Sequence, residues 1–509
     1  MKRLAVFSAF LLAALCAAAD ARIGASRKGG CYYPGESVEL RCSADGATVL
    51  RVRVSDWLGK EILVKKVPEG EGSVAVSEAE LHGLFGAFRA ALEGRRADGS
   101  EAVLAHGWFA RLTRKKVEPV DWAGTGVHGW PADMSYLDHI ATAGLGMVRQ
   151  ETGWANSERE KGVYTVPDTF EATLARMKEL GIGINFIFNY DNPVAYPEDP
   201  FNCEAFCAWA KHFASKYTDI KVFEIWNEGY NFGFRKKYGD DWNYDFVKFC
   251  RPVAEALHEV RPDATVEVCA EDGWEALEVQ LKAGIAKKND CVSIHPYIHG
   301  ADPRPERHYY FFKDGGAAMR RVASENGGAS RFRITEMGWT TYSADENGKA
   351  EHWFVGGYPG VSYASQAQYI VRAYLIARSN GIECMMQYDF HDDGPRRNYT
   401  EHNFGLMFED YTPKPSFAAV AQMTRLLGEA EPLGETQDDG SKMCVCRFRM
   451  PGGSIAYAAW AVEGTVEIDL PKEIAGGGRI VDLMGNARPV APEETRIALT
   501  ERPVYMLSE

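Results

Sequence analysis

The chain has 509 residues, of which 46% are hydrophobic and 25% charged, and its formal net charge is -14 at pH 7. This composition is typical of a soluble globular protein, and the length is too great for one hydrophobic core, so we expect two to four domains. The negative balance argues against a nucleic-acid-binding surface and provides no attraction to anionic lipid.

The start of the chain has the pattern of a signal peptide, which we assign to residues 1–21. A positive start at Lys2 and Arg3 precedes an apolar run that ends at Leu15, and small residues suited to cleavage follow. The run is short for a membrane anchor, and Leu15 stands where a lipoprotein signal would place a small residue before Cys16. We therefore predict a secreted or periplasmic protein without a membrane span.

Residues 26–116 have the pattern of an all-β domain. Segments 37–41 and 49–54 alternate apolar and polar residues, which is the period-two signature of half-buried strands. We predict an N-terminal β-sandwich that serves as a packing domain, with a carbohydrate-binding module as the alternative. Cys31 and Cys42 flank a strand-like segment, and export would permit them to form a disulfide.

Strands alternate with helices from about Asp121 onward, which predicts βα units and a parallel sheet. The helices carry boundary signals: Gly181 ends one of them, and Lys414-Pro415 opens the last. The eight strand candidates are 124–128, 147–149, 184–188, 222–226, 265–269, 291–295, 332–335 and 383–387. Eight such units within residues 121–428 predict a (β/α)8 barrel, also called a TIM barrel.

The pattern is all-β again in residues 432–509, where we predict a C-terminal β-sandwich packed on the barrel. The predicted fold class is therefore α/β, a TIM barrel flanked by an N-terminal β-sandwich and a C-terminal β-sandwich. Cys269, Cys291 and Cys384 fall inside predicted barrel strands and are expected in the core. No Cys/His spacing resembles a zinc site, and we predict no metal and no cofactor.

Two glutamates stand at the ends of predicted strands four and seven. An apolar or β-branched run leads to Glu228 in one case and to Glu336 in the other. C-terminal strand ends face the active site of such a barrel, and strands four and seven lie roughly across it. A lone glutamate after a strand would be interpreted as a surface salt bridge. Two opposed carboxylates, however, supply the general acid and the nucleophile for cleaving a glycosidic bond with retention, which requires a separation of about 5–5.5 Å.

Several motifs resemble those of glycoside hydrolase clan A, and most closely those of family 39 and its endoglycosidase-like relatives. They are Trp226-Asn227-Glu228, Thr335-Glu336-Met337-Gly338-Trp339, Asn403-Phe404-Gly405-Leu406, Pro413-Lys414-Pro415 and Arg502-Pro503-Val504-Tyr505. The resemblance covers about residues 121–509. It implies a retaining hydrolase that cleaves β-glycosidic bonds in an oligo- or polysaccharide, with Glu228 as acid/base and Glu336 as nucleophile.

The predicted substrate-binding residues surround these two glutamates. The resemblance implies that Arg149 keeps Glu336 ionised, that Asn227 donates to the sugar 2-hydroxyl and that Tyr297 hydrogen-bonds Glu336. His295 lines the floor of the site or is a satisfied core residue. The full predicted set is Arg149, Asn189, Asn227, His295, Tyr297, Trp339, Tyr388 and Asp389.

The loops after strands four, seven and eight are rich in aromatic and acidic residues. We expect some of the aromatic side chains to stack on sugar rings and more than half to pack among themselves. They are Tyr230, Phe232, Phe234, Tyr238, Trp242, Trp339, Tyr342, Trp353, Phe354 and Tyr358. Strand eight ends in the run 388–393, where the clan often has a Trp and this chain offers Tyr388 and Phe390. The acidic residues of this run bind hydroxyls or a cation, or form a solvated turn, which is the interpretation we prefer.

Two rival functions share the same residues: a catalytically inactive barrel that binds glycans, and a transglycosylase. A third, a barrel with unrelated chemistry, would place the two glutamates far apart. The expected partner is a carbohydrate substrate and not a nucleic acid, and the sequence gives no oligomeric state.

Overall fold

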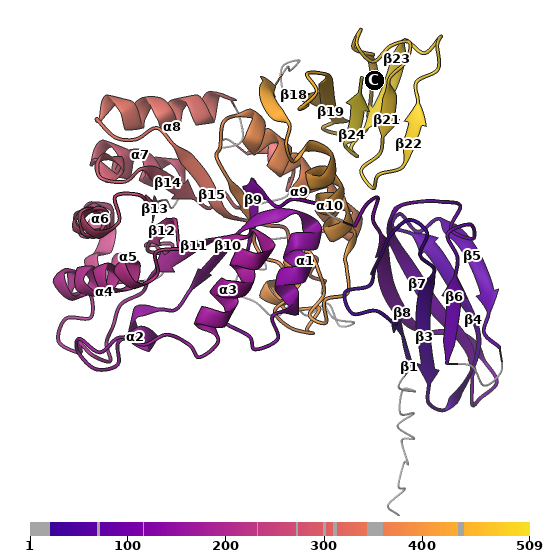
Figure 1. Cartoon of the computed structure of the whole chain (residues 1–509), viewed down its shortest axis with the longest axis horizontal. Helices are drawn as coiled ribbons and strands as arrows, with labels where there is room; N and C mark the ends of the chain where they lie inside the picture. Colours follow the sequence, from indigo (N-terminus) through magenta and orange to yellow (C-terminus); the bar gives the residue numbers. More distant parts are fainter. Residues whose placement is uncertain are drawn as a thin grey trace, which may run out of the picture.

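The computed structural model describes residues 21–68, 72–115, 117–231, 233–270, 273–298, 302–308, 313–343, 360–435 and 442–508. The predicted signal peptide therefore lies outside the described residues, apart from Ala21, as does Cys16. Three bodies of secondary structure follow one another along the chain: an N-terminal set of sheets, a barrel and a C-terminal set of sheets (Figure 1).

The central body is a closed barrel of eight parallel strands, as the sequence predicted. The strands are β9 Val120–Gly126, β10 Leu145–Glu151, β11 Gly183–Phe188, β12 Val222–Ile225, β13 Thr265–Cys269, β14 Cys291–Ile294, β15 Phe332–Met337 and β16 Met385–Gln387. Sequential strands are neighbours, and β16 pairs with β9 to close the barrel. Every residue of β12 and β14 is buried, which is why these strands are nearly continuous apolar runs.

Helices surround the barrel and return the chain from the end of one strand to the start of the next. They are α1 Ser135–Ala143, α2 Trp154–Ser157, α3 Phe170–Leu180, α4 Cys203–Lys216, α5 Phe234–Tyr238, α6 Trp242–Val260, α7 Trp274–Lys282, α8 Lys313–Glu325, α9 Tyr363–Ser379 and α10 Pro415–Leu427. The predicted end of one helix and the predicted start of another are confirmed. Gly181 caps α3 in the left-handed conformation with φ of 72°, and Pro415 opens α10.

Two sheets form the N-terminal body, and their strands are antiparallel except for β2, which pairs with β8 in parallel. One has the order β1-β3-β6 and the other β2-β8-β7-β4-β5. The strands are β1 Ala21–Ala25, β2 Cys31–Tyr32, β3 Val38–Ala44, β4 Ala47–Asp56, β5 Glu61–Lys66, β6 Ser73–Val76, β7 Gly86–Arg96 and β8 Glu101–Arg111. Both sheets contribute to one apolar cluster, which is compatible with a sandwich. The first sheet starts at Ala21, ahead of the boundary expected at residue 26.

The possible Cys31–Cys42 disulfide does not form, because both thiols are free. Cys31 belongs to β2 and packs in the cluster that continues into the barrel. Cys42 belongs to β3 in the other sheet and packs in the N-terminal cluster instead. Burial raises the pKa of the Cys31 thiol to about 12, so it remains a protonated core residue.

The C-terminal body consists of a six-stranded sheet, β17-β18-β19-β24-β21-β22, and the β20-β23 pair. Its strands are β17 Glu431–Glu435, β18 Met443–Arg449, β19 Ile455–Ala461, β20 Thr465–Asp469, β21 Arg479–Val481, β22 Ala487–Pro489, β23 Arg496–Thr500 and β24 Val504–Leu507. Both sheets contribute to one apolar cluster, which is again compatible with a sandwich. None of the helices in the described part of the chain combines the length and hydropathy needed to span a bilayer.

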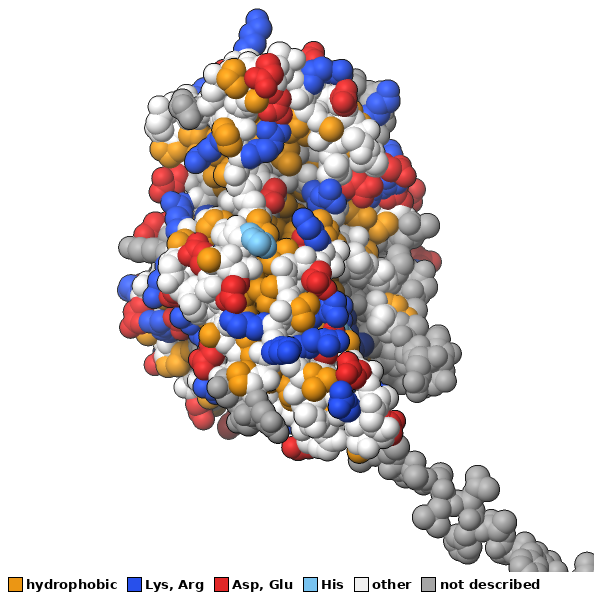
Figure 2. Space-filling model, turned by 90° about the vertical axis from the view of Figure 1, so that its right-hand side faces the viewer, with side chains coloured by type: hydrophobic (Ala, Val, Ile, Leu, Met, Phe, Trp, Pro, Cys, Tyr) orange, Lys and Arg blue, Asp and Glu red, His pale blue; other side chains and the backbone are white. Residues whose placement is uncertain are grey.

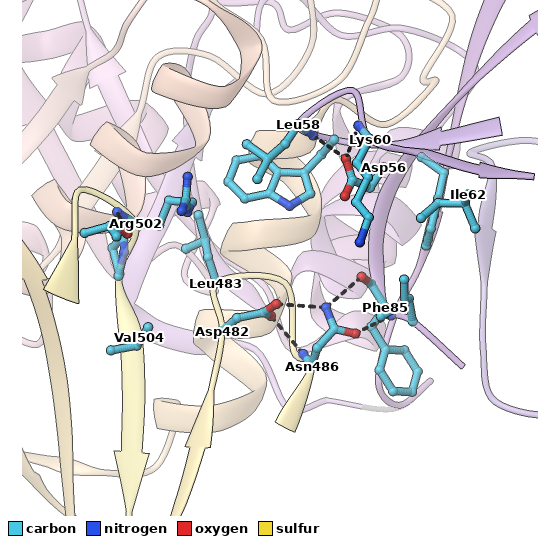
Figure 3. Close-up of a pocket in the computed structure, with 15 residues that line it drawn as sticks. Asp56, Leu58, Lys60, Ile62, Phe85, Asp482, Leu483, Asn486, Arg502 and Val504 are labelled. Carbon is cyan, nitrogen blue, oxygen red and sulfur yellow. Dashed lines mark hydrogen bonds between the residues drawn. The ribbon is translucent and has the colours of Figure 1, made fainter. Parts of the chain in front are cut away.

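The N-terminal and C-terminal bodies meet around a cavity of about 360 Å³ (Figure 3). Asn486 joins them, because its side chain accepts a hydrogen bond from the Phe85 backbone N–H at 2.8 Å and donates to the Phe85 carbonyl at 3.3 Å. Asp482 holds the Asn486 amide from the other side at 2.9 Å. The face that these two bodies present carries interspersed acidic and basic side chains rather than a continuous basic stripe (Figure 2).

Candidate active site

Glu228 and Glu336 meet at the carboxyl end of the barrel. Glu336 lies in β15 and Glu228 follows β12, and a carboxylate oxygen of one lies within 4.8 Å of a carboxylate oxygen of the other. His295, just after β14, has a ring nitrogen within the same distance of both. The structure therefore brings together the two glutamates that the sequence placed on opposite strands, and a barrel with the two far apart is excluded.

The backbone between β12 and Glu228 adopts an unusual conformation. Trp226 and Glu228 have positive φ values of 67° and 44°, which cost residues other than glycine about 1–3 kcal/mol each. The Trp226 indole is fully buried, with the rings of Phe234 and Phe249 at centroid distances of 4.7 and 5.5 Å. This aromatic packing holds the strained turn and with it the position of the Glu228 carboxylate.

Arg149 in β10 organises the floor of the site through three carboxylate or amide contacts. Its guanidinium donates to Glu224 at 2.6 Å, to the Asn227 side-chain oxygen at 2.8 Å and to Glu336. Arg149 is buried, and attraction to Glu224 and then Glu336 outweighs the cost of burial and raises its pKa well above the usual value. The guanidinium therefore provides a permanent positive charge beside Glu336, as predicted.

Glu224 is a residue of the site that the sequence interpretation missed. It points into the barrel from β12, is fully buried, and accepts from Ser293 at 2.7 Å and Thr335 at 2.8 Å as well as from Arg149. Burial opposes its ionisation, but Arg149 outweighs burial and holds the pKa of Glu224 below the usual value. Its only signal in the sequence is an acidic residue inside an otherwise apolar strand.

Replacing Glu224 with glutamine is expected to lower the free energy of unfolding by about 3–5 kcal/mol, because Arg149 loses a charged partner in a buried pair. Urea denaturation measures the effect. The matched control is Glu179→Gln on the exposed surface, where a side chain that is 65% exposed should contribute less than about 1 kcal/mol. Equal effects of the two substitutions would contradict a structural role for the Glu224–Arg149 pair.

Tyr297 and His295 contact the two glutamates from the β14 side. The Tyr297 hydroxyl donates to Glu336 at 3.1 Å, as predicted. His295 Nδ1 lies 3.0 Å from Glu228 and 3.6 Å from Glu336, and its Nε2 lies 3.0 Å from the Thr335 hydroxyl. His295 is thus in the core and in the site at once, so the two interpretations offered for it do not exclude each other.

Asn227 and Asn189 occupy different places. Asn227 accepts from Arg149 and donates to the Tyr190 hydroxyl at 2.9 Å, so it is fixed beside Glu228. Asn189 is fully buried and donates to Glu151 at the end of β10. Tyr190 and Asn231, which donates to Glu228 at 3.0 Å, are further members of the site that the sequence did not single out.

Tyr388 and Asp389 line the β16 side of the site. The Tyr388 ring packs 6.2 Å from Tyr297, and its hydroxyl donates to Glu401 at 3.2 Å. Asp389 is buried beside His128. Phe390 is also fully buried, but it packs against Phe417 of α10 and so does not replace the Trp of the clan.

Trp339 is buried and does not expose its ring to a cleft. Its indole is 4% exposed, donates to the Pro303 carbonyl at 2.7 Å and packs against Tyr369 of α9. Phe234 and Trp242 are buried as well and pack within the loop after β12. The predicted cleft residues Phe232, Trp353, Phe354 and Tyr358 lie outside the described residues.

A cavity of about 570 Å³ adjoins the Glu228 side of the site. Two of its walls are the side chains that hold Asn227 and Glu228, namely Tyr190 and Asn231. Phe201 adds an apolar surface, and Lys236 and Lys237 add positive charge. The volume falls in the range of pockets that hold small ligands.

The protein is thus a (β/α)8 barrel in which two carboxylates approach each other at the carboxyl end of the strands. No protein-family model matches the sequence, and a search of curated proteins found no match. Among solved structures, the chain is similar to a family 39 glycoside hydrolase from the gut symbiont Bacteroides cellulosilyticus WH2. The TM-score is 0.71 at 20% identity, over 96% of this chain and 100% of that one. A glucosidase from Croceicoccus marinus matches with a TM-score of 0.49 at 12% identity, over 78% of this chain and 100% of that one. The chain therefore shares the fold of a family 39 glycoside hydrolase, which confirms the predicted resemblance at the level of structure.

Proposed function

We propose that the protein is a retaining glycoside hydrolase that cleaves β-glycosidic bonds in an oligo- or polysaccharide by double displacement. The observation that carries this proposal is the approach of the Glu228 and Glu336 carboxylates to within 4.8 Å. Retaining enzymes separate their two carboxyl groups by about 5–5.5 Å, whereas inverting enzymes leave about 6.5–9.5 Å for a water molecule.

In the first step, Glu336 attacks the anomeric carbon and forms a glycosyl-enzyme ester, while Glu228 donates a proton to the departing oxygen. In the second step, Glu228 takes a proton from water, which attacks the ester and releases Glu336. Arg149 and Tyr297 both donate to Glu336 and stabilise its anionic form, both before attack and after release. Asn227, fixed beside Glu228, is placed to donate to the sugar 2-hydroxyl.

A ring nitrogen of His295 lies 3.0 Å from a carboxylate oxygen of Glu228, close enough for the two groups to exchange one proton. Burial alone raises the pKa of Glu228, but the hydrogen bond and charge of His295 outweigh it and place that pKa below the usual value. Burial alone lowers the pKa of His295, but the Cys269 thiol and the carboxylates of Glu336 and Glu228 raise it well above the usual value. The proton of the pair therefore favours His295 over Glu228, and His295 can pass it to Glu228 as the leaving oxygen departs.

Replacing His295 with asparagine is expected to shift the alkaline limb of the kcat/KM profile to lower pH. In the wild-type pair the proton is lost only above the pKa of His295, which stands well above its usual value. The variant must hold the proton on Glu228, whose pKa rises once the contact with His295 is gone but belongs to a carboxyl group, and the usual pKa of a carboxyl group lies below that of an imidazole. A pH series with one aryl β-glycoside measures both limbs. An unchanged alkaline limb with a uniformly lower rate would indicate that His295 has only a structural role.

The proposal is tested by assaying the purified chain against aryl β-glycosides and plant and microbial polysaccharides. Turnover of a β-linked substrate supports it, and failure of every β-linked substrate would contradict it. Binding of glycans without turnover would indicate the inactive barrel, and products with an added acceptor sugar would indicate a transglycosylase. The double displacement needs no cofactor beyond these side chains.

We also propose that the chain is exported, which fractionation of cells expressing the full sequence would test.

A further inference from the structure

The cavity between the N-terminal and C-terminal bodies is separate from the proposed active site (Figure 3). Its volume of about 360 Å³ lies at the lower end of the range for pockets that hold small ligands. All of its lining residues belong to segments 56–88 and 482–504, and none belongs to the barrel. It is lined both by the buried side chains of Phe88 and Leu483 and by the exposed side chains of Lys60 and Arg502, so it reaches from the core to the solvent.

Two turns of the same construction line this cavity, one from each body (Figure 3). In each turn an aspartate, Asp56 or Asp482, accepts from the backbone N–H groups two and four positions later, at 2.8–2.9 Å. A glycine three positions after the aspartate, Gly59 or Gly485, has a positive φ of 87° or 103°. The carboxylate and the glycine fix the backbone of both turns, so each turn presents its side chains on a rigid frame.

The two turns differ in the exposure of their apolar side chains. In the C-terminal turn, Leu483 and Met484 are 1% and 2% exposed and pack in the core. In the N-terminal turn, Leu58 is 49% exposed, and Trp57 is half-buried and lines the cavity. The same frame that buries apolar side chains in one body thus keeps an indole accessible in the other. An indole in the wall of a cavity offers a flat apolar face on which a sugar ring can stack.

Four polar groups of this cavity have no hydrogen-bond or ion-pair partner among the described residues. They are the Lys60 ammonium, the Arg502 guanidinium, the Trp57 indole N–H and the Oδ2 atom of Asp56. Arg502 opens the last of the sequence motifs, which the proposed active site does not use. Three donors and one acceptor match hydroxyl groups, which both donate and accept. An anion fits less well, because the carboxylates of Asp56 and Asp482 would repel it.

We propose that this cavity binds one unit of a neutral glycan and forms a second carbohydrate site outside the barrel. The sugar ring stacks on Trp57, its hydroxyl groups accept from Lys60 and Arg502, and one hydroxyl donates to Asp56. Because no residue of the barrel lines the cavity, a glycan held there leaves the two glutamates free. A chain bound at this site has a raised effective concentration at the barrel of the same molecule.

The test measures glycan binding rather than cleavage, so its outcome does not depend on the proposed reaction. The full chain with Glu336→Gln, which prevents digestion of the ligand, is run in native gels that contain a polysaccharide at rising concentration. The neutral probes are barley β-glucan, arabinoxylan and galactomannan, and polygalacturonate is the acidic comparison. We expect at least one neutral probe to retard the chain, with a Kd on the order of 1 mM in sugar units, and polygalacturonate to leave its mobility unchanged.

Four further substitutions in the same chain locate the site. Trp57→Ala should weaken binding about ten-fold or more, and Lys60→Gln and Arg502→Gln about three-fold or more each. The matched control is Arg41→Gln, on an exposed position of β3, which should bind as the parent chain does. Lys60 and Arg502 are exposed and without partners in the described part of the chain, so their replacement preserves the fold even if Trp57→Ala does not.

Three results would overturn the proposal. In the first, no neutral polysaccharide retards the chain, and the cavity is only a gap between two packed bodies. In the second, polygalacturonate alone retards it, and the ligand is an anion. In the third, the Lys60 and Arg502 variants are retarded as strongly as the parent chain, which would assign all of the binding to the barrel.

Discussion

Replacing Glu336 with glutamine is expected to lower kcat/KM for an aryl β-glycoside by at least about 10⁴-fold, or about 5.4 kcal/mol of transition-state stabilisation. The amide has the size of the carboxylate and can still accept from Arg149, so the fold of the site should be preserved. It cannot form the glycosyl-enzyme ester, however, and both steps of the proposed reaction depend on that ester.

The matched control for this prediction is Glu383→Gln, the same substitution at the opposite end of the barrel, where Glu383 pairs with Arg331 at 2.5 Å. Its kcat/KM should remain within a few-fold of the wild type. A 2-deoxy-2-fluoro glycoside of the same sugar should label the wild-type chain once, on the peptide that contains Glu336. A label on another residue, or an active Glu336→Gln variant, would refute the assignment of the nucleophile.

The barrel and its two glutamates were predictable because they depend on local sequence signals. Buried parallel strands require continuous apolar runs, and the eight runs in the sequence match the eight strands to within a few residues. A residue that directly follows such a run lies at the carboxyl end of its strand, and in a parallel barrel all these ends lie on the same side. Glu228 and Glu336 could therefore be placed at the same rim of the barrel from one sequence.

The partners of these residues were less predictable because they depend on contacts between distant segments. In the sequence, Glu224 is one residue of an apolar strand. Its role becomes visible only in the fold, where it contacts Arg149, 75 positions earlier. In the sequence, Asp392 belongs to a polar run that indicates a turn. In the fold it is buried and pairs with Lys414. Trp339 follows Glu336 by three positions, yet its ring packs against Tyr369 of α9, a contact that local sequence does not reveal.

Replacing Glu228 with glutamine is expected to have an effect that depends on the leaving group. For a substrate with a poorly acidic leaving group, such as another sugar, kcat/KM should fall by about 10²–10⁴-fold, the usual contribution of a general acid. For a dinitrophenyl glycoside, whose leaving group departs without a proton, the first step should proceed at nearly the wild-type rate. Only an acid/base residue predicts this contrast, since loss of the nucleophile slows both substrates equally.

The second step provides an independent check on the same variant. Without Glu228, water cannot be activated, so the glycosyl-enzyme should accumulate and appear as a burst of dinitrophenol. Azide needs no base, and it should restore turnover and yield the β-glycosyl azide by attack on the ester at Glu336. The same addition to Glu336→Gln should give no β-azide, because that variant forms no ester. If azide failed to restore turnover in Glu228→Gln while the burst remained absent, Glu228 would not be the acid/base, and His295, its partner at 3.0 Å, would be the next residue to test in that role.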